Sequence, residues 1–280
     1  MKGTDILTLL TKIKSFYAPL QPGVPIGGQE IVYTEVKPDH EIEHLVYCFW
    51  QLRTPQPLEE PFSYRVVSDG CIDIFFNNNR ISESFVMGFS KNYTAFSIGT
   101  DFDYVGIRFL PAAFPTLFSI AATNLNSDSQ FLYEVLPDFA KWLQASISTQ
   151  SSLSYICTQM NGKLREILHS KELDVDIRFL GALHLIFQNK GYLQTENDLD
   201  TGLSPRQLRR IFNYYIGTTP KAFSNVVRFQ YILNAIPLGQ LSKDSRVYLE
   251  VGFFDQAHFI KDFKRFYGVT PTQAFGHIPN

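Results

Sequence analysis

The segment over residues 247–275 carries the most regular pattern of hydrophobic and polar positions in the chain. Phe259, Phe263 and Phe266 recur at intervals of four and three residues, which places them on one face of a helix. Asp255 precedes them and can cap the helix, because its carboxylate accepts a hydrogen bond from an unpaired backbone N–H group. The pattern predicts a short helix with an aromatic buried face and a polar, basic outer face.

The same pattern occurs once more, 51 positions upstream. Phe212 corresponds to Phe263, and residues 217–220 correspond to residues 268–271. In both copies a glycine follows the helix and a Thr-Pro pair opens the next one, with threonine as the cap and proline in the first turn. The repeat predicts two helix-turn-helix units.

The N-terminal half has a different pattern. A weakly amphipathic stretch over residues 1–20 predicts one helix. Short β-rich runs follow, and the Asp69-Gly70 pair between two of them predicts a tight turn. Further helices are expected at 111–125, 134–146 and 153–168. We expect the β-rich runs to form a sandwich or barrel, and they cover residues 31–36, 62–67, 71–76, 84–89, 94–98 and 104–110.

The C-terminal motifs resemble the DNA-binding domain of the AraC family. The sequence from Gly202 to Phe212 (GLSPRQLRRIF), with the Gly-x-Thr-Pro that follows, is similar to the first half of that domain. Residues 252–259 and 268–271 are similar to the second half, and the resemblance covers about residues 175–277.

A second, shorter resemblance involves the N-terminal half. Residues 67–75 and 106–113 are similar to the sensor half of a subset of AraC-type regulators, with Ser68 where proline is more usual.

The two resemblances imply an α+β protein of two domains. A mixed β-rich, barrel- or sandwich-like sensor or dimerisation domain with helices is expected over residues 1–168, and an all-α bipartite helix-turn-helix domain over residues 169–280. A linker helix long enough to span about 24 Å can hold two recognition helices about one DNA turn apart. The first unit is expected at about 191–217, the linker helix at 220–236 and the second unit at about 244–267.

The resemblance places DNA contacts on both recognition helices. Arginine reads guanine, glutamine suits adenine, and apolar side chains can contact the thymine methyl group. The base-reading positions fall on Arg206, Arg209, Arg210, Gln256, Ala257, Ile260 and Lys261. Lys221, Lys264 and Arg265 are assigned to phosphate contacts, and Gln207, Asn213 and His258 complete the predicted DNA-binding set.

The first helix-turn-helix unit departs from the family pattern. Asn197 and Asp198 stand where an apolar and a small residue are usual. We therefore expect the second unit to contribute more to DNA binding.

Charge supports this division of the chain. The net charge is −2, but residues 170–280 carry 13 Lys and Arg against 10 Asp and Glu, whereas residues 1–169 carry 12 against 17. The positive half is the one expected to contact DNA. Cys48, Cys71 and Cys157 are too few and too far apart for a disulfide framework or a Cys-x-x-Cys metal pair, which indicates free thiols in a reducing cytoplasm.

Two further groups of residues are candidates for a ligand-binding site and a metal site. Arg65, Asp69, Asp73 and Arg108 can line a pocket for a small molecule, although turn residues and surface ion pairs explain them equally well. Residues 40–44 spell His-Glu-x-x-His, which in zinc proteases places two imidazoles on one helix turn with a glutamate as base. The string is short and no third ligand follows on a helix, so no metal and no cofactor are expected.

We predict a cytoplasmic, bacterial-type transcription regulator that binds double-stranded DNA and is not an enzyme. The resemblance implies control by a small molecule or partner at the N-terminal domain, and it adds a homodimer and RNA polymerase as partners. No membrane contact is expected, because no apolar run is long enough to span one. Two alternatives stay open: a ligand-independent regulator whose N-terminal domain only dimerises, and a metal-dependent enzyme that uses His40, Glu41 and His44.

Overall fold

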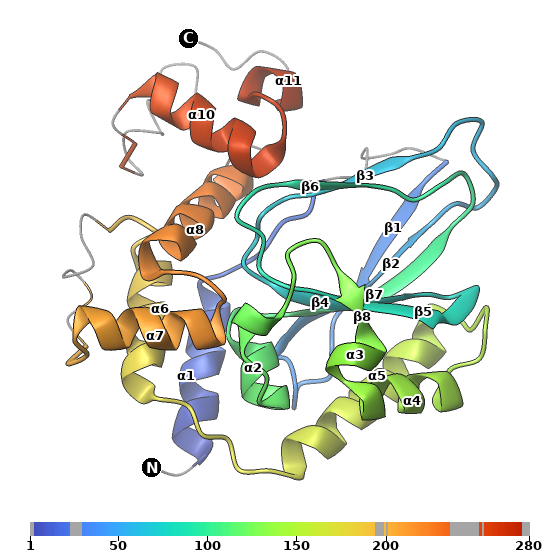
Figure 1. The fold of residues 1–280 in the computed structure, drawn as a ribbon, viewed down its shortest axis with the longest axis horizontal. Helices are drawn as coiled ribbons and strands as arrows, with labels where there is room; N and C mark the ends of the chain where they lie inside the picture. Colours follow the sequence, from blue (N-terminus) through green and yellow to red (C-terminus); the bar gives the residue numbers. More distant parts are fainter. Residues whose placement is uncertain are drawn as a thin grey trace.

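The computed structural model describes residues 3–22, 30–193, 199, 201–235, 252–253 and 255–275. Figure 1 shows a β-rich body on one side and a group of helices on the other. The two expected departures at Asn197 and Asp198 lie outside the described residues, and so does the segment 236–251, which includes the expected start of the second helix-turn-helix unit.

Six antiparallel strands form the main sheet, in the order β1-β2-β7-β4-β5-β8. A separate sheet pairs β3 (Ser63–Val66) with β6 (Thr94–Ser97). The expectation of a β-rich N-terminal domain beside a helical C-terminal domain is confirmed. The strands of the main sheet are β1 (Val32–Val36), β2 (Val46–Arg53), β4 (Ile72–Asn77), β5 (Arg80–Met87), β7 (Asp103–Phe109) and β8 (Gln130–Phe131).

Side chains alternate between the two faces of the main sheet, as the pleat requires. On β7, Val105, Ile107 and Phe109 belong to the main hydrophobic core, which the helices cover. Tyr104 and Arg108, on the same strand, point to the opposite face, toward β3 and β6. The sheet therefore has one closed, apolar face and one face that borders a second, smaller core.

The first group of helices packs against the β-rich body (Figure 1). The helix expected at 111–125 is interrupted at Ser119, which has a φ of 59°, and continues only as a short 3-10 turn. The helix expected at 134–146 is divided at Leu136, because the following proline starts a new helix. These helices are α2 (Ala113–Phe118), α3 (Leu132–Val135), α4 (Pro137–Ser146) and α5 (Leu153–His169).

The second group of helices includes one from the start of the chain. The ring centroids of Tyr17, just after α1, and Phe187 on α6 are 4.5 Å apart, and those of Phe16 and His184 are 5.2 Å apart. The first helix of the chain therefore packs against the C-terminal helices, as Figure 1 also shows. The group comprises α1 (Gly3–Ser15), α6 (Ile177–Gln188), α7 (Pro205–Tyr215), α8 (Pro220–Ala235), α10 (Gln256–Tyr267) and α11 (Pro271–Phe275).

The predicted tight turn at Asp69-Gly70 connects strands of two different sheets. β3 precedes this pair and belongs to the small sheet, whereas β4 follows it and pairs with β5 and β7 in the main sheet. The chain therefore crosses from one sheet to the other at this point. The Asp69 carboxylate accepts a hydrogen bond from the Cys71 N–H group at 2.9 Å, so the turn is local but the strands on its two sides have different partners.

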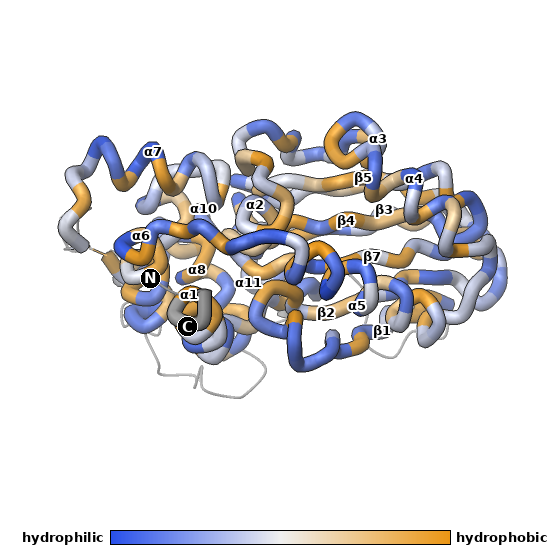
Figure 2. The backbone as a smooth tube through the Cα atoms, turned by 90° about the horizontal axis from the view of Figure 1, so that it is seen from below, coloured by the Kyte–Doolittle hydropathy of each residue, from blue (hydrophilic) through white to orange (hydrophobic). Residues whose placement is uncertain are grey.

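Hydropathy along the chain follows this arrangement. Figure 2 shows hydrophobic segments inside both bodies and hydrophilic segments along the outer turns of α7. Among the described residues, no helix is long and apolar enough to cross a membrane. The three cysteines are buried and not joined in disulfides.

Candidate functional site

The sequence around Ser204 explains why α7 begins there. The Ser204 hydroxyl accepts a hydrogen bond from the Gln207 N–H group, and the Gln207 side-chain oxygen accepts one from the Ser204 N–H group at 3.0 Å. This reciprocal capping satisfies two backbone donors that the helix leaves unpaired. Leu208 and Phe212 are buried beneath the helix, and the exposed side chains include those of Arg206, Gln207, Arg209, Arg210 and Asn213.

The α10 helix repeats this construction. Asp255 caps it by accepting a hydrogen bond from the His258 N–H group at 2.7 Å. Phe263 and Phe266 are buried against Phe229 of α8, with ring centroids 5.6 and 5.2 Å away. The exposed positions are Gln256, Ala257, His258, Ile260, Lys261, Lys264 and Arg265.

The α8 helix supports both units, and Lys221 in its first turn is exposed. Arg228 lies on the buried side of α8, where its guanidinium donates a hydrogen bond to the Gly252 carbonyl at 3.0 Å. The same group lies 4.4 Å from the centre of the Phe253 ring. Arg228 therefore fastens the residues just before α10 to α8, a role that the sequence did not indicate.

A cluster of charged side chains lies where β1, β4 and β7 meet residues 67–71, the crossover between the two sheets. The Arg108 guanidinium is 3.1 Å from Asp73, 3.5 Å from Asp69 and 3.8 Å from Glu35. Only 2% of the Arg108 side chain is exposed, so these carboxylates replace the water that the cation has lost. Burial raises the pKa of Asp73 to about 6, and the positive charge of Arg108 acts in the opposite direction.

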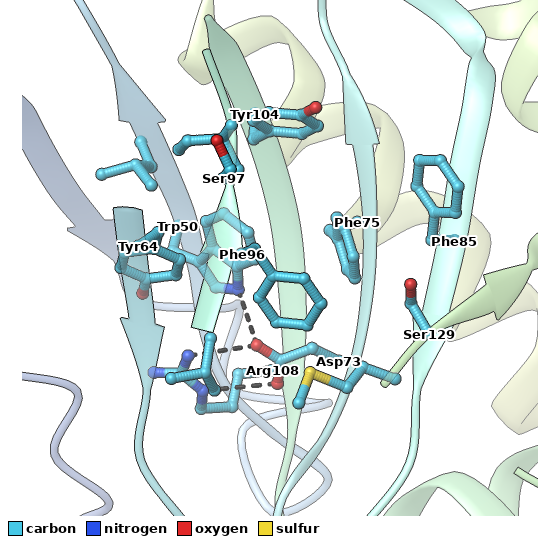
Figure 3. Close-up of a pocket in the computed structure, with 14 residues that line it drawn as sticks. Trp50, Tyr64, Asp73, Phe75, Phe85, Phe96, Ser97, Tyr104, Arg108 and Ser129 are labelled. Atoms are coloured by element: carbon cyan, nitrogen blue, oxygen red, sulfur yellow. Dashed lines mark hydrogen bonds and ion pairs between the residues drawn. The ribbon is translucent and has the colours of Figure 1, made fainter. Parts of the chain in front are cut away.

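A cavity of about 210 Å³ opens between the two sheets, with Asp73 and Arg108 at one end (Figure 3). The Trp50 indole N–H donates a hydrogen bond to Asp73 at 3.0 Å, which orients the carboxylate in the cavity wall. Half of the other lining residues are aromatic, and the rings belong to Trp50, Tyr64, Phe75, Phe85, Phe96 and Tyr104.

The structure brings together three of the four residues expected around a ligand. Asp73 and Arg108 line the cavity, and Asp69 contacts Arg108 from the side of the crossover. Arg65 lies elsewhere, with its guanidinium 5.9 Å from the centre of the Tyr267 ring at the end of α10. The sequence did not reveal the aromatic walls, because the six rings come from six different strands and only their pairing brings them together.

The His-Glu-x-x-His string does not have the geometry of a zinc-protease motif. Residues 40–45 form turns rather than a helix. The His40 side chain is 96% exposed, whereas His44 is buried, and burial lowers the pKa of His44 to about 4. The string is therefore not a solvent-facing helical turn, because His44 is buried. In the part of the chain that the structure describes, no three His, Cys, Asp or Glu side chains are grouped as metal ligands.

Two segments of the chain match known protein families. Residues 200–276 match the family described as a helix-turn-helix domain, and residues 34–130 match a domain of unknown function (DUF6597). An uncharacterized HTH-type transcriptional regulator of Haemophilus influenzae is 35% identical over 86 residues. The matched segment is 31% of this chain and spans 28% of the length of that relative.

Solved structures of ToxT from Vibrio cholerae align with most of the chain, at low TM-score and low identity. The apo form gives a TM-score of 0.44 at 13% identity and covers 80% of this chain and 96% of ToxT. The complex with (E)-4-(8-methylnaphthalen-1-yl)but-3-enoic acid gives 0.43 at 10% identity and covers 79% and 98%.

The capped helices and the family match define the class: the C-terminal part of this chain is a helix-turn-helix domain. The motifs of this domain resemble those of the AraC family, and residues 34–130 of the same chain match a domain of unknown function.

Proposed function

We propose that this protein is a transcription regulator that inserts α7 and α10 into successive major grooves of double-stranded DNA. The observation that carries the proposal is the repeated design of these two helices. Each is capped by a side chain, buries aromatic or aliphatic side chains against the helical body, and exposes basic and amide side chains. Helices of this kind enter the major groove and read base edges.

The two recognition helices can be tested separately, because Arg210 on α7 and Lys261 on α10 occupy corresponding positions. Arg210→Ala and Lys261→Ala are each expected to weaken binding to the operator by about 10- to 100-fold, the usual range for losing a base contact. The measurement is fluorescence anisotropy on duplex DNA from upstream of the protein's own gene, with a shuffled duplex for comparison.

Lys141→Ala is the matched control, because Lys141 is an exposed lysine on α4, on the β-rich body. This variant should bind like the parent protein. If all three variants bind alike, or if the parent protein binds both duplexes equally, the proposed base readout is wrong. A steep fall in affinity with salt on both duplexes would indicate phosphate contacts alone.

We further propose that the N-terminal domain controls DNA binding through its contacts with α10. The Tyr93 N–H group donates to the Arg265 carbonyl at 3.1 Å, and the Arg265 guanidinium donates to the Asn92 side chain at 2.9 Å. The Ser68 N–H group donates to the Phe266 carbonyl at 3.4 Å. These contacts hold the C-terminal end of the second recognition helix against the β-rich body.

The segment that contacts α10 through Ser68 also contacts the charged end of the cavity through Asp69. Asp69 contacts Arg108 at the cavity end, and its carboxylate accepts a hydrogen bond from Gln21 at 2.7 Å. One residue earlier, the Ser68 carbonyl accepts a hydrogen bond from Gln230 of α8 at 2.9 Å. A ligand that moves Arg108 would therefore act on a segment that also contacts α8 and α10. The cavity supports a sensor domain over one that only dimerises.

The Asn92 contact gives a testable consequence. Asn92→Ala is expected to release the Arg265 guanidinium for a DNA phosphate, so that affinity rises severalfold and the slope of log affinity against log salt steepens by about one. Anisotropy titrations at several salt concentrations measure both quantities. Asn79→Ala, at an exposed asparagine in the β4–β5 turn, serves as the control. An unchanged slope for Asn92→Ala would argue against control through this contact.

A further inference from the structure

The aromatic walls of the cavity between the two sheets are suited to a positively charged ligand. Phe75, Phe85, Phe96 and Tyr104 are only half-buried although they lie inside a compact body, because their rings face the cavity (Figure 3). The face of an aromatic ring carries partial negative charge and attracts a cation that lies within about 6 Å of its centre.

At the charged end of the cavity, the one positively charged side chain among the described lining residues is already paired with carboxylates. Among the described residues that line it, Arg108 is the only base. Its Nε and Nη2 atoms donate to Asp73 at 3.3 and 3.1 Å, and Nη1 lies 3.8 Å from Glu35. With Asp69 at 3.5 Å, three carboxylates face one guanidinium. The cluster therefore carries an excess of negative charge, and a bound carboxylate would be repelled.

Asp73 still has capacity for one more donor. A carboxylate offers about four lone-pair sites. The two oxygens of Asp73 accept hydrogen bonds from Arg108 Nε, Arg108 Nη2 and Trp50 Nε1. One site therefore remains for an N–H group that enters from the cavity, and the aromatic rings around it would replace water about a positive charge.

From these observations we propose that the cavity binds an organic cation, a protonated amine on an aromatic or apolar body, with the ammonium group next to Asp73 and the body between the rings. The role of this ligand as the effector rests on the proposed function, but its binding does not. Binding of the cation is therefore measured directly, without DNA. The cation can bind even if the protein does not bind DNA, and the protein can bind DNA even if the cation does not bind.

Three probes of nearly equal shape test the charge preference: 2-phenylethylamine, 2-phenylethanol and 3-phenylpropionate. The chain has two tryptophans, and Trp50 lines the cavity. In a Trp142→Phe background, tryptophan fluorescence therefore reports on Trp50 alone. We expect the amine to bind about tenfold more tightly than the alcohol, the size of a partly desolvated cation–π contact, and the carboxylate to bind more weakly than both.

Two variants show whether the cavity is responsible. Asp73→Asn and Phe96→Leu should each lower the ratio of amine to alcohol affinity, the first by about tenfold. Phe96 is half-buried on β6, so Phe96→Leu keeps the test valid if Asp73→Asn does not fold. Equal binding of the amine and the alcohol, tighter binding of the carboxylate, no binding of any probe at millimolar concentration, or an unchanged ratio in Phe96→Leu would each overturn the proposal.

Discussion

Arg108→Ala is expected to lower the free energy of unfolding by about 3–5 kcal/mol, the usual cost of removing one partner from a buried ion pair. The guanidinium is almost fully buried and compensates Asp73 and Asp69, and it also lies near Glu35. Without it, carboxylates in the protein interior must either stay charged without a partner or become protonated. Urea unfolding of the whole chain measures the change.

Arg53→Ala provides the comparison, because Arg53 is an exposed arginine on β2, and its loss should change stability by no more than about 0.5 kcal/mol. In an Arg108→Met background, Asp73→Asn should recover part of the lost stability, because the two residues interact and their effects are not additive. A loss below about 1 kcal/mol for Arg108→Ala would mean that the cluster does not depend on this cation.

Gly191→Ala is the second substitution with a large expected effect, about 2–5 kcal/mol from backbone strain and overpacking together. Gly191 follows α6 with a φ of +73°, and its N–H group donates to the Ile186 carbonyl at 2.8 Å. A Cβ atom there would lie 2.2 Å from the Ser224 carbonyl oxygen and 2.5 Å from the Arg228 nitrogen. These are backbone atoms of α8, so α6 and α8 would have to separate.

A substitution at Gly202 distinguishes the cost of backbone strain from the cost of overpacking. Its φ of +72° is nearly the same, but a Cβ atom there would have no neighbour within 4 Å. Gly202→Ala should therefore cost only the backbone strain, about 1–2 kcal/mol. Thermal or urea unfolding of both variants gives the difference, and equal losses would show that the close approach to α8 does not matter.

The recognition helices could be predicted from the sequence because their determinants are local. Ser204 and Asp255 cap the helices within one turn, and Phe212 and Phe263 mark their buried faces by spacing alone. Caps and helix faces depend on residues three or four positions apart, and these residues are close in space whenever the helix forms. The same holds for α5, which covers nearly the expected range.

Most strands could be predicted, although β2 and β8 were not among the expected β-rich runs, and the partners of the strands could not be predicted. A run of alternating residues shows that a strand exists and leaves open which strand it pairs with. The Asp69-Gly70 pair therefore predicts a turn, but not that the turn connects strands of two different sheets. Because the cavity depends on strand pairing, its aromatic walls could not be predicted either.

The sequence by itself determined two capped helices of one design, a helical C-terminal half and a β-rich N-terminal half. The tertiary structure alone decided the placement of Arg108 among three carboxylates, the stacking of Arg65 on Tyr267, and the packing of the first helix against the C-terminal ones. The physical reason is the distance along the chain. Contacts between residues tens to hundreds of positions apart depend on how whole elements pack, and no local pattern of polarity or spacing records that choice.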